Sequence, residues 1–153
     1  MRRPSRSAGF TLIEMLVAIL IAAVLIGMVV VSGAPSPSRA LETDADRLAQ
    51  LLALAREEAQ VRGAPIRLEV DERQFRFVQF RDAQWRVIDN DSFLRPRAWS
   101  DTTEFQLIRS DGAGELEFGR DLVDAPYRIR LARPPYRIEI VANGLGAFEI
   151  VRP

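Results

Sequence analysis

The chain has 153 residues and a formal net charge of zero, because 21 arginines balance 21 acidic residues and lysine is absent. It contains neither cysteine nor histidine, which excludes disulfides, zinc–thiolate sites, thiol nucleophiles and the commonest general base. The length fits one modest domain with a short additional segment. The sequence has no phosphate-binding glycine loop and no hydrolase serine motif, so it predicts a protein that is not an enzyme and uses no cofactor or metal.

Residues 10–31 form a long apolar run in which Glu14 is the only charged residue. As a helix, this run spans about 33 Å, which matches a membrane hydrocarbon core about 30 Å thick. The basic leader of residues 1–9 predicts that the N-terminus stays cytoplasmic and that the rest is exported. A cleaved secretory signal is the alternative. It is disfavoured because the run exceeds the usual length of about 7–15 residues and Pro35 follows the small residues at 32–34.

Glu14 lies four residues into the apolar run, where a carboxylate in a bilayer costs free energy and usually has a partner. Cleavage between Gly9 and Phe10 would create a free amino group at the start of the helix. In a parallel, staggered bundle, that amine could meet the Glu14 carboxylate of a neighbouring subunit. The alternative is a lone glutamate near the membrane interface with no role in assembly.

The arginine-rich leader and the sequence Gly-Phe-Thr-Leu-Ile-Glu from Gly9 to Glu14 resemble the processing site of type IV pilins and type II secretion pseudopilins. The resemblance implies that a prepilin peptidase cleaves after Gly9 and that Phe10 is N-methylated. It also implies that Glu14 sets subunit register during assembly.

The next segment, residues 32–38, contains Pro35 and Pro37 and predicts a break in the helix. A second, amphipathic helix is predicted from about residue 38 or 39 to residue 61, and Gly63 and Pro65 end it. Its apolar residues recur at spacings of three and four, which indicates a single face packed on a sheet. These residues are Leu41, Ala45, Leu48, Leu52, Ala55 and Ala59.

After Pro65 the apolar residues alternate with polar ones, which is typical of antiparallel strands. The expected fold class is therefore α+β: one long helix followed by about seven or eight short strands in two sheets. A long loop is expected at residues 89–103, and Asn143-Gly144 predicts a hairpin turn. The strands are expected at residues 66–70, 75–80, 85–87, 104–108, 115–118, 127–131, 136–140 and 147–151.

Several segments that follow the N-terminal motif make the resemblance more specific. Residues 47–59, residues 63–66, Trp85 and residues 91–97 look like the H-type minor pseudopilin of type II secretion, within the group that also contains minor type IV pilins. The resemblance implies a pilin-like fold with a cleaved leader (1–9), a transmembrane and assembly helix (10–31), a break (32–38) and a periplasmic domain (39–153).

This resemblance implies a structural subunit at or near the tip of a periplasmic pseudopilus, anchored in the inner membrane by a single pass, that aids export of folded proteins across the outer membrane. The implied partners are the other minor pseudopilins, the major pseudopilin and prepilin peptidase, with the exported substrate as a further candidate. Trp99, in the predicted loop, is a candidate partner contact, whereas Trp85 is expected in the core. Asp89-Asn90-Asp91 begins like a calcium loop, but a solvated turn fits better.

The alternative function is a minor type IV pilin that binds DNA in natural transformation. Its support is a C-terminal excess of arginine. Removal of the leader's three arginines, however, leaves 18 against 21 acidic residues, a net charge of −3, so nucleic acid is not expected as a partner. The arginines concerned are Arg128, Arg130, Arg133, Arg137 and Arg152.

Overall fold

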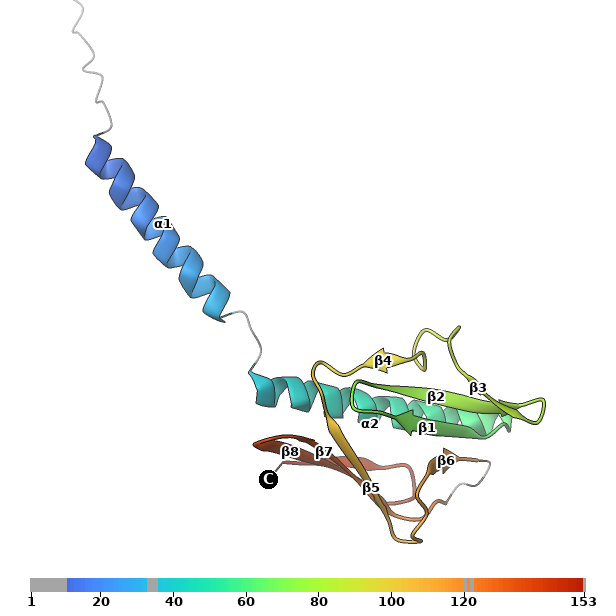
Figure 1. The fold of residues 1–153 in the computed structure, drawn as a ribbon. Helices are drawn as coiled ribbons and strands as arrows, with labels where there is room; N and C mark the ends of the chain where they lie inside the picture. The colour runs from blue at the N-terminus through green and yellow to red at the C-terminus, as the bar shows by residue number, and fades with distance from the viewer. Residues whose placement is uncertain (1–10, 33–35, 120, 122, 153) are drawn as a thin grey trace, which may run out of the picture. The chain divides into compact units, whose positions relative to one another are not determined.

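The computed structural model describes residues 11–32, 36–119, 121 and 123–152. The chain divides into two units, residues 1–35 and 36–153. In the first unit, α1 runs from Leu12 to Ser32 (Figure 1). Thr11 caps this helix, because its hydroxyl oxygen accepts a hydrogen bond from the Glu14 backbone N–H at 3.3 Å. Within the described residues, no helix meets the length and apolarity needed to cross a membrane.

The second unit begins with α2, which extends from Pro37 to Arg62. Ser36 is its N-cap and accepts a hydrogen bond from Arg39 N, while Gly63 ends the helix in the left-handed conformation at φ 62°. The sequence predicts a break up to residue 38, but Pro37 starts the helix instead. Proline suits the first helical turn because the N–H that it lacks has no partner there.

Nine strands follow α2 in the described part of the chain, one more than the upper end of the expected number. The additional strand is β4, two residues long, inside the segment expected to be a loop, where it pairs with β2. The strands are β1 Ile66–Val70, β2 Gln74–Arg81, β3 Gln84–Val87, β4 Arg97–Ala98, β5 Glu104–Arg109, β6 Leu116–Phe118, β7 Tyr127–Arg133, β8 Tyr136–Ala142 and β9 Phe148–Val151.

The strands form two antiparallel sheets, which confirms the expected fold class. The first sheet has the order β3-β2-β1-β6, with β4 also on β2, and the second has the order β5-β7-β8-β9. Although β5 and β6 are consecutive in the chain, β5 pairs with β7 and β6 pairs with β1. The turn between β5 and β6 therefore carries the chain from one sheet to the other.

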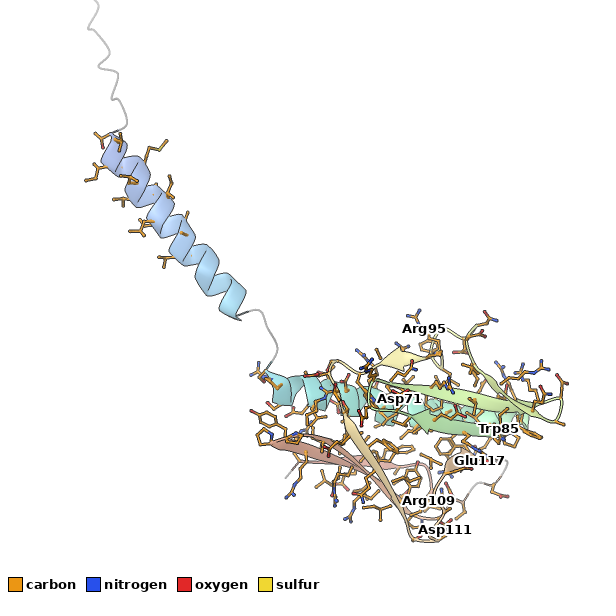
Figure 2. The ribbon with its side chains drawn as sticks, viewed as in Figure 1. Asp71, Trp85, Arg95, Arg109, Asp111 and Glu117 are labelled. Atoms are coloured by element: carbon orange, nitrogen blue, oxygen red, sulfur yellow. The ribbon has the colours of Figure 1, made fainter. Side chains whose placement is uncertain are left out.

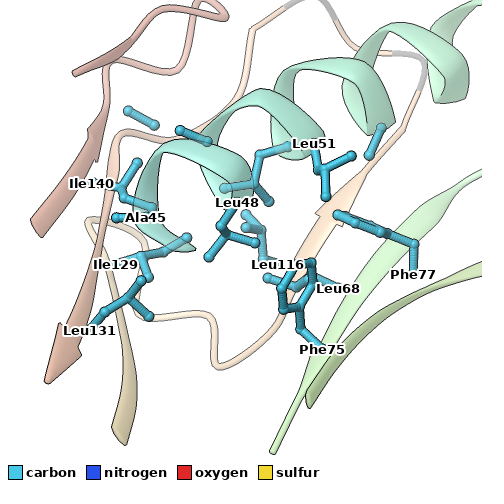
Figure 3. Close-up of a cluster of buried hydrophobic side chains, with 14 of the residues drawn as sticks. Ala45, Leu48, Leu51, Leu68, Phe75, Phe77, Leu116, Ile129, Leu131 and Ile140 are labelled. Atoms are coloured by element: carbon cyan, nitrogen blue, oxygen red, sulfur yellow. The ribbon is translucent and has the colours of Figure 1, made fainter. Parts of the chain in front are cut away.

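The hydrophobic core lies where α2 meets both sheets. Leu48 of α2 lies between Ile129 and Leu131 of the second sheet and Leu68 and Phe75 of the first (Figure 3). The full predicted stripe of α2 is buried. Burying a side chain of this size contributes about 1.5–3 kcal/mol, so the helix face and the inner faces of the sheets stabilise one another.

Candidate assembly site

The N-terminal motif is described from Thr11 onward. The leader, the predicted cleavage residue Gly9 and the predicted methylation site Phe10 lie outside the described residues. Glu14 lies in the first turn of α1, and the apolar side chains of residues 12–25 around it are exposed (Figure 2). A helix that is apolar on every face is normally buried in protein or lipid. Glu14 is thus the one charged side chain among the exposed residues 12–25 of α1.

Trp99 is part of the core and is not a surface contact, which corrects the expectation from its position in a loop. It is 6% exposed, and its ring lies 4.6 Å from that of Phe75. Its indole N–H donates a hydrogen bond to the Asp71 carbonyl oxygen at 3.0 Å. The short strand β4 causes this burial, because its pairing with β2 holds the next residue over the core.

Trp85, for which the sequence predicts a place in the core, is only partly buried. The Arg67 guanidinium carbon lies 4.1 Å from the centre of its ring, and the Phe80 ring packs on it at 5.3 Å. Arg67 also forms ion pairs with Glu115 and Glu117, each at 3.0 Å. Arg67 therefore connects Trp85 of β3 with Glu117 of β6. These contacts hold the Trp85 ring in place at the β3 edge of the first sheet.

A buried ion pair joins α2 to the second sheet. Asp44 Oδ2 accepts hydrogen bonds from Arg133 at 2.5 Å and from the Ser100 N–H and hydroxyl at 2.9 and 2.7 Å. Arg133 also donates to the Thr103 hydroxyl oxygen at 2.8 Å. Burial acts to raise the pKa of Asp44, but the hydrogen bonds from Arg133 and Ser100 outweigh it and hold this pKa below its usual value.

This pair was not predicted from the sequence, although one signal for it was present. Asp44 lies directly beside Leu41, Ala45 and Leu48 of the apolar stripe, where a charge requires a buried partner. Its partner is 89 residues away in the chain, so spacing alone could not identify it.

Four of the five C-terminal arginines form ion pairs with carboxylates of the described residues. Arg128 and Arg130 both pair with Glu139, at 3.3 and 2.9 Å, and Arg133 is buried against Asp44. A surface that neutralises phosphates needs unpaired cations aligned on one face. The contacts of these three residues therefore do not favour DNA binding.

The segment that begins like a calcium loop forms a turn instead. Asp91 Oδ1 accepts hydrogen bonds from the backbone N–H groups of Phe93 and Leu94 at 2.7 and 2.9 Å. These two bonds lower the pKa of Asp91. Next to this turn is a cleft of about 320 Å³, lined by the C-terminal part of α2, by β2 and β3, and by residues 88–91 and 94. We refer to it below as the α2–β3 cleft.

Two known sequence families match parts of this chain. The prokaryotic N-terminal methylation motif matches residues 4–30, and the family described as type II transport protein GspH matches residues 44–146. A curated relative, type II secretion system protein H of Pseudomonas aeruginosa, is 35% identical over 144 residues, covering 82% of this chain and 83% of that protein.

Solved structures agree on the fold. Two structures of the minor pseudopilin EpsH from the type II secretion system of Vibrio cholerae match with TM-scores of 0.59 and 0.63, at 18% and 17% identity. They cover 73% and 77% of this chain and 96% and 97% of the EpsH chains. The fold is therefore the pilin-like fold that the sequence predicted. Because the family match spans most of the globular domain and the methylation motif spans the N-terminal helix, the chain belongs to the GspH family of type II transport proteins.

Proposed function

We propose that this chain is a minor pseudopilin at or near the tip of a short periplasmic pseudopilus that helps to export folded proteins across the outer membrane. In this proposal the apolar run of residues 10–31, whose side chains the structure describes only for residues 11–25, crosses the inner membrane once. The leader lies in the cytoplasm and residues 39–153 lie in the periplasm. Prepilin peptidase removes residues 1–9, and Phe10 becomes the methylated N-terminus.

The observation that carries the proposal is α1 itself. All of its side chains from residue 12 to residue 25 are exposed, and all except that of Glu14 are apolar. An apolar helix of this kind is normally buried, either in lipid or among other apolar helices. Assembly then consists of moving α1 from lipid into a helical bundle, and membership of the GspH family is consistent with this mechanism.

Glu14 has the role of fixing the register of each subunit in the bundle. A carboxylate in an apolar bundle is stable only if a cation or a hydrogen-bond donor meets it. The new α-amino group of a neighbouring Phe10 supplies both. An incoming subunit in the wrong register would leave both charges unpaired.

The test is Glu14→Ala in full-length protein, expressed in a host that lacks its own copy. We expect normal insertion and leader removal, but about a tenfold loss of subunit recovered in pseudopili, the effect of about 1.4 kcal/mol. Secretion should fall in parallel. Normal incorporation and secretion by this variant would contradict the role of Glu14.

A matched variant separates processing from assembly. Gly9→Val should leave the full-length precursor in the membrane, because the bulky side chain blocks cleavage while Glu14 is unchanged. Mass spectrometry of the intact protein measures this directly. A product shortened by nine residues would overturn the cleavage assignment.

A further inference from the structure

The strand β3 is the outer strand of the first sheet, and the described part of the chain places no strand on its free side. A two-residue turn with both φ angles positive, Asp82 at 52° and Ala83 at 61°, fixes its register on β2. Ile88 N donates to the Phe77 carbonyl oxygen at 2.9 Å, so residues 77 and 88 form a hydrogen-bonded pair.

Hydrogen-bonded and non-bonded pairs alternate along an antiparallel ladder. Arg86 and Gln84 therefore bond to β2, whereas the backbone groups of Trp85 and Val87 point away from it. On the other side of the same ladder, Phe80 N donates to the Pro65 carbonyl oxygen at 2.9 Å, as this alternation requires. The free edge of β3 thus presents the backbone N–H and C=O groups of Trp85 and Val87.

Beside this edge, the side chain of Gln79 is a further polar group without a hydrogen-bond partner. It is 3% exposed, and its side-chain nitrogen has no hydrogen-bond partner among the described residues. It lines the α2–β3 cleft, where an acceptor would satisfy this buried donor.

The charges of the cleft do not favour a small ion. Three arginines and three acidic residues line it, so they balance. Arg62 pairs with Glu58, and Asp91 is engaged by two backbone N–H groups. What remains unmet at Gln79 is a neutral donor, which suits an amide or carboxyl oxygen on a polypeptide.

The opposite face of the same edge is apolar. Phe80 and Val87 are 40% and 38% exposed, and Trp85 is held between Phe80 and Arg67. Aromatic side chains that are already fixed lose little freedom on binding, which makes them effective contacts for a partner.

We propose that β3 binds an extended strand of another pseudopilin subunit, which adds to the first sheet at this edge. An extended chain repeats its donors and acceptors every second residue, at about 6.6–6.8 Å, and so matches Trp85 and Val87. Successive side chains of the added strand point to opposite faces of the sheet. On one face, a side chain with a hydrogen-bond acceptor enters the α2–β3 cleft toward Gln79. On the other face, the next side chain is apolar and packs on Trp85. This inference rests on the proposed function, because it takes the partner from the pseudopilus.

Two variants test the edge and the cleft separately. Val87→Pro removes the outward N–H but none of the bonds to β2, and Val87→Thr is its control because it keeps both the N–H and the branched shape. Gln79→Met replaces the unpaired amide by an apolar chain of similar size. If the amide serves a partner, this variant is at least as stable as the parent protein and yet binds more weakly.

The experiment uses the full-length chain in membranes with the other pseudopilins of its own secretion system as probes. A photoreactive benzoylphenylalanine replaces Gln84 on β3 or, in a second variant, Leu16 on α1. We expect the residue-84 cross-link to map to an extended, alternating segment of one pseudopilin. Val87→Pro and Gln79→Met should each lower its yield about tenfold, the effect of about 1.4 kcal/mol, and Val87→Thr should not.

The outcomes separate the two proposals. Cross-links from residue 16 without any from residue 84, or cross-links from residue 84 that neither variant lowers, overturn the strand proposal alone. Absence of cross-links from residue 16 overturns the proposed function. If Val87→Pro fails to fold, as judged by tryptophan fluorescence, Gln79→Met decides the question.

Discussion

At the scale of single residues, the Asp44–Arg133 pair is a contact whose disruption should strongly destabilise the domain. Both side chains are buried, and Ser100 and Thr103 complete their hydrogen bonds. Desolvation makes such a pair a weak net contributor, but removing one partner leaves an uncompensated charge in the core. The pair therefore fixes how α2, β7 and the end of the loop before β5 meet.

Replacing one member should destabilise the domain more than replacing both. We expect Arg133→Met to lower the free energy of unfolding by about 3–5 kcal/mol, because Asp44 then lies buried without its cation. The double variant Asp44→Leu with Arg133→Met should show a smaller decrease in the free energy of unfolding. Urea unfolding followed by tryptophan fluorescence measures both, since Trp85 and Trp99 lie in the globular domain. An additive loss in the double variant would contradict this account, and the exposed substitution Asp46→Asn is the control.

Asp44 also predicts how stability responds to acid. Its pKa is lower in the folded protein than in the unfolded chain, so the folded state binds this proton less readily. The stabilisation is complete above the unfolded value of about 3.9 and is lost as the pH falls through the lower, folded value.

Unfolding free energies measured between neutral pH and pH 3 should therefore fall in the parent protein and fall less in the double variant. Some acid sensitivity should remain, because backbone hydrogen bonds also lower the pKa values of Asp71 and Asp91. Identical pH profiles for the two proteins would rule out Asp44 as a contributor.

At the scale of elements, local pattern predicted most of the secondary structure, and pairing across the chain accounts for the differences. The apolar stripe of α2 and the alternation of β1, β2, β7 and β8 are local signals, and the structure confirms them. Strand β4 has two residues and no alternation, so it exists only because β2 offers an edge to it. The same pairing buries Trp99, which explains why its predicted exposure was wrong.

The turn between β8 and β9 provides a test of one predicted element. Gly144 has φ 79°, and a Cβ atom on it would overlap the Asp124 carbonyl oxygen. Gly112 has a similar φ of 75° but open space around it. Gly112→Ala should cost about 1–2 kcal/mol from backbone conformation alone. Gly144→Ala should cost about 1–3 kcal/mol more, because the turn must move away from Asp124. Equal losses in urea unfolding would show that the overlap is relieved without cost.

At the scale of the whole molecule, the sequence separated the N-terminal helix from the globular domain because their compositions differ sharply. The candidate site is less predictable. The motif at residues 9–14 could be identified because its residues are contiguous, and its roles remain proposals. The β3 edge and Gln79 could not be identified, because their significance depends on which backbone groups the ladder leaves free and on which side chains lack partners.

The division of the chain at residues 35 and 36 predicts that the globular domain folds by itself. Its core consists of one face of α2 and the two sheets, all within residues 36–153. A truncated protein that starts at Ser36 keeps the N-cap of α2 and should unfold in one cooperative transition, at the same urea concentration as the full-length chain in detergent. A protein that starts at residue 39 lacks Ser36 and Pro37 and should lose about 0.5–2 kcal/mol of its free energy of unfolding through the missing cap.

A gradual, non-cooperative change for the Ser36 protein would mean that α1 contributes to the core. Because α1 is needed only for membrane insertion and assembly in our proposal, that result would count against the division of roles between the two units.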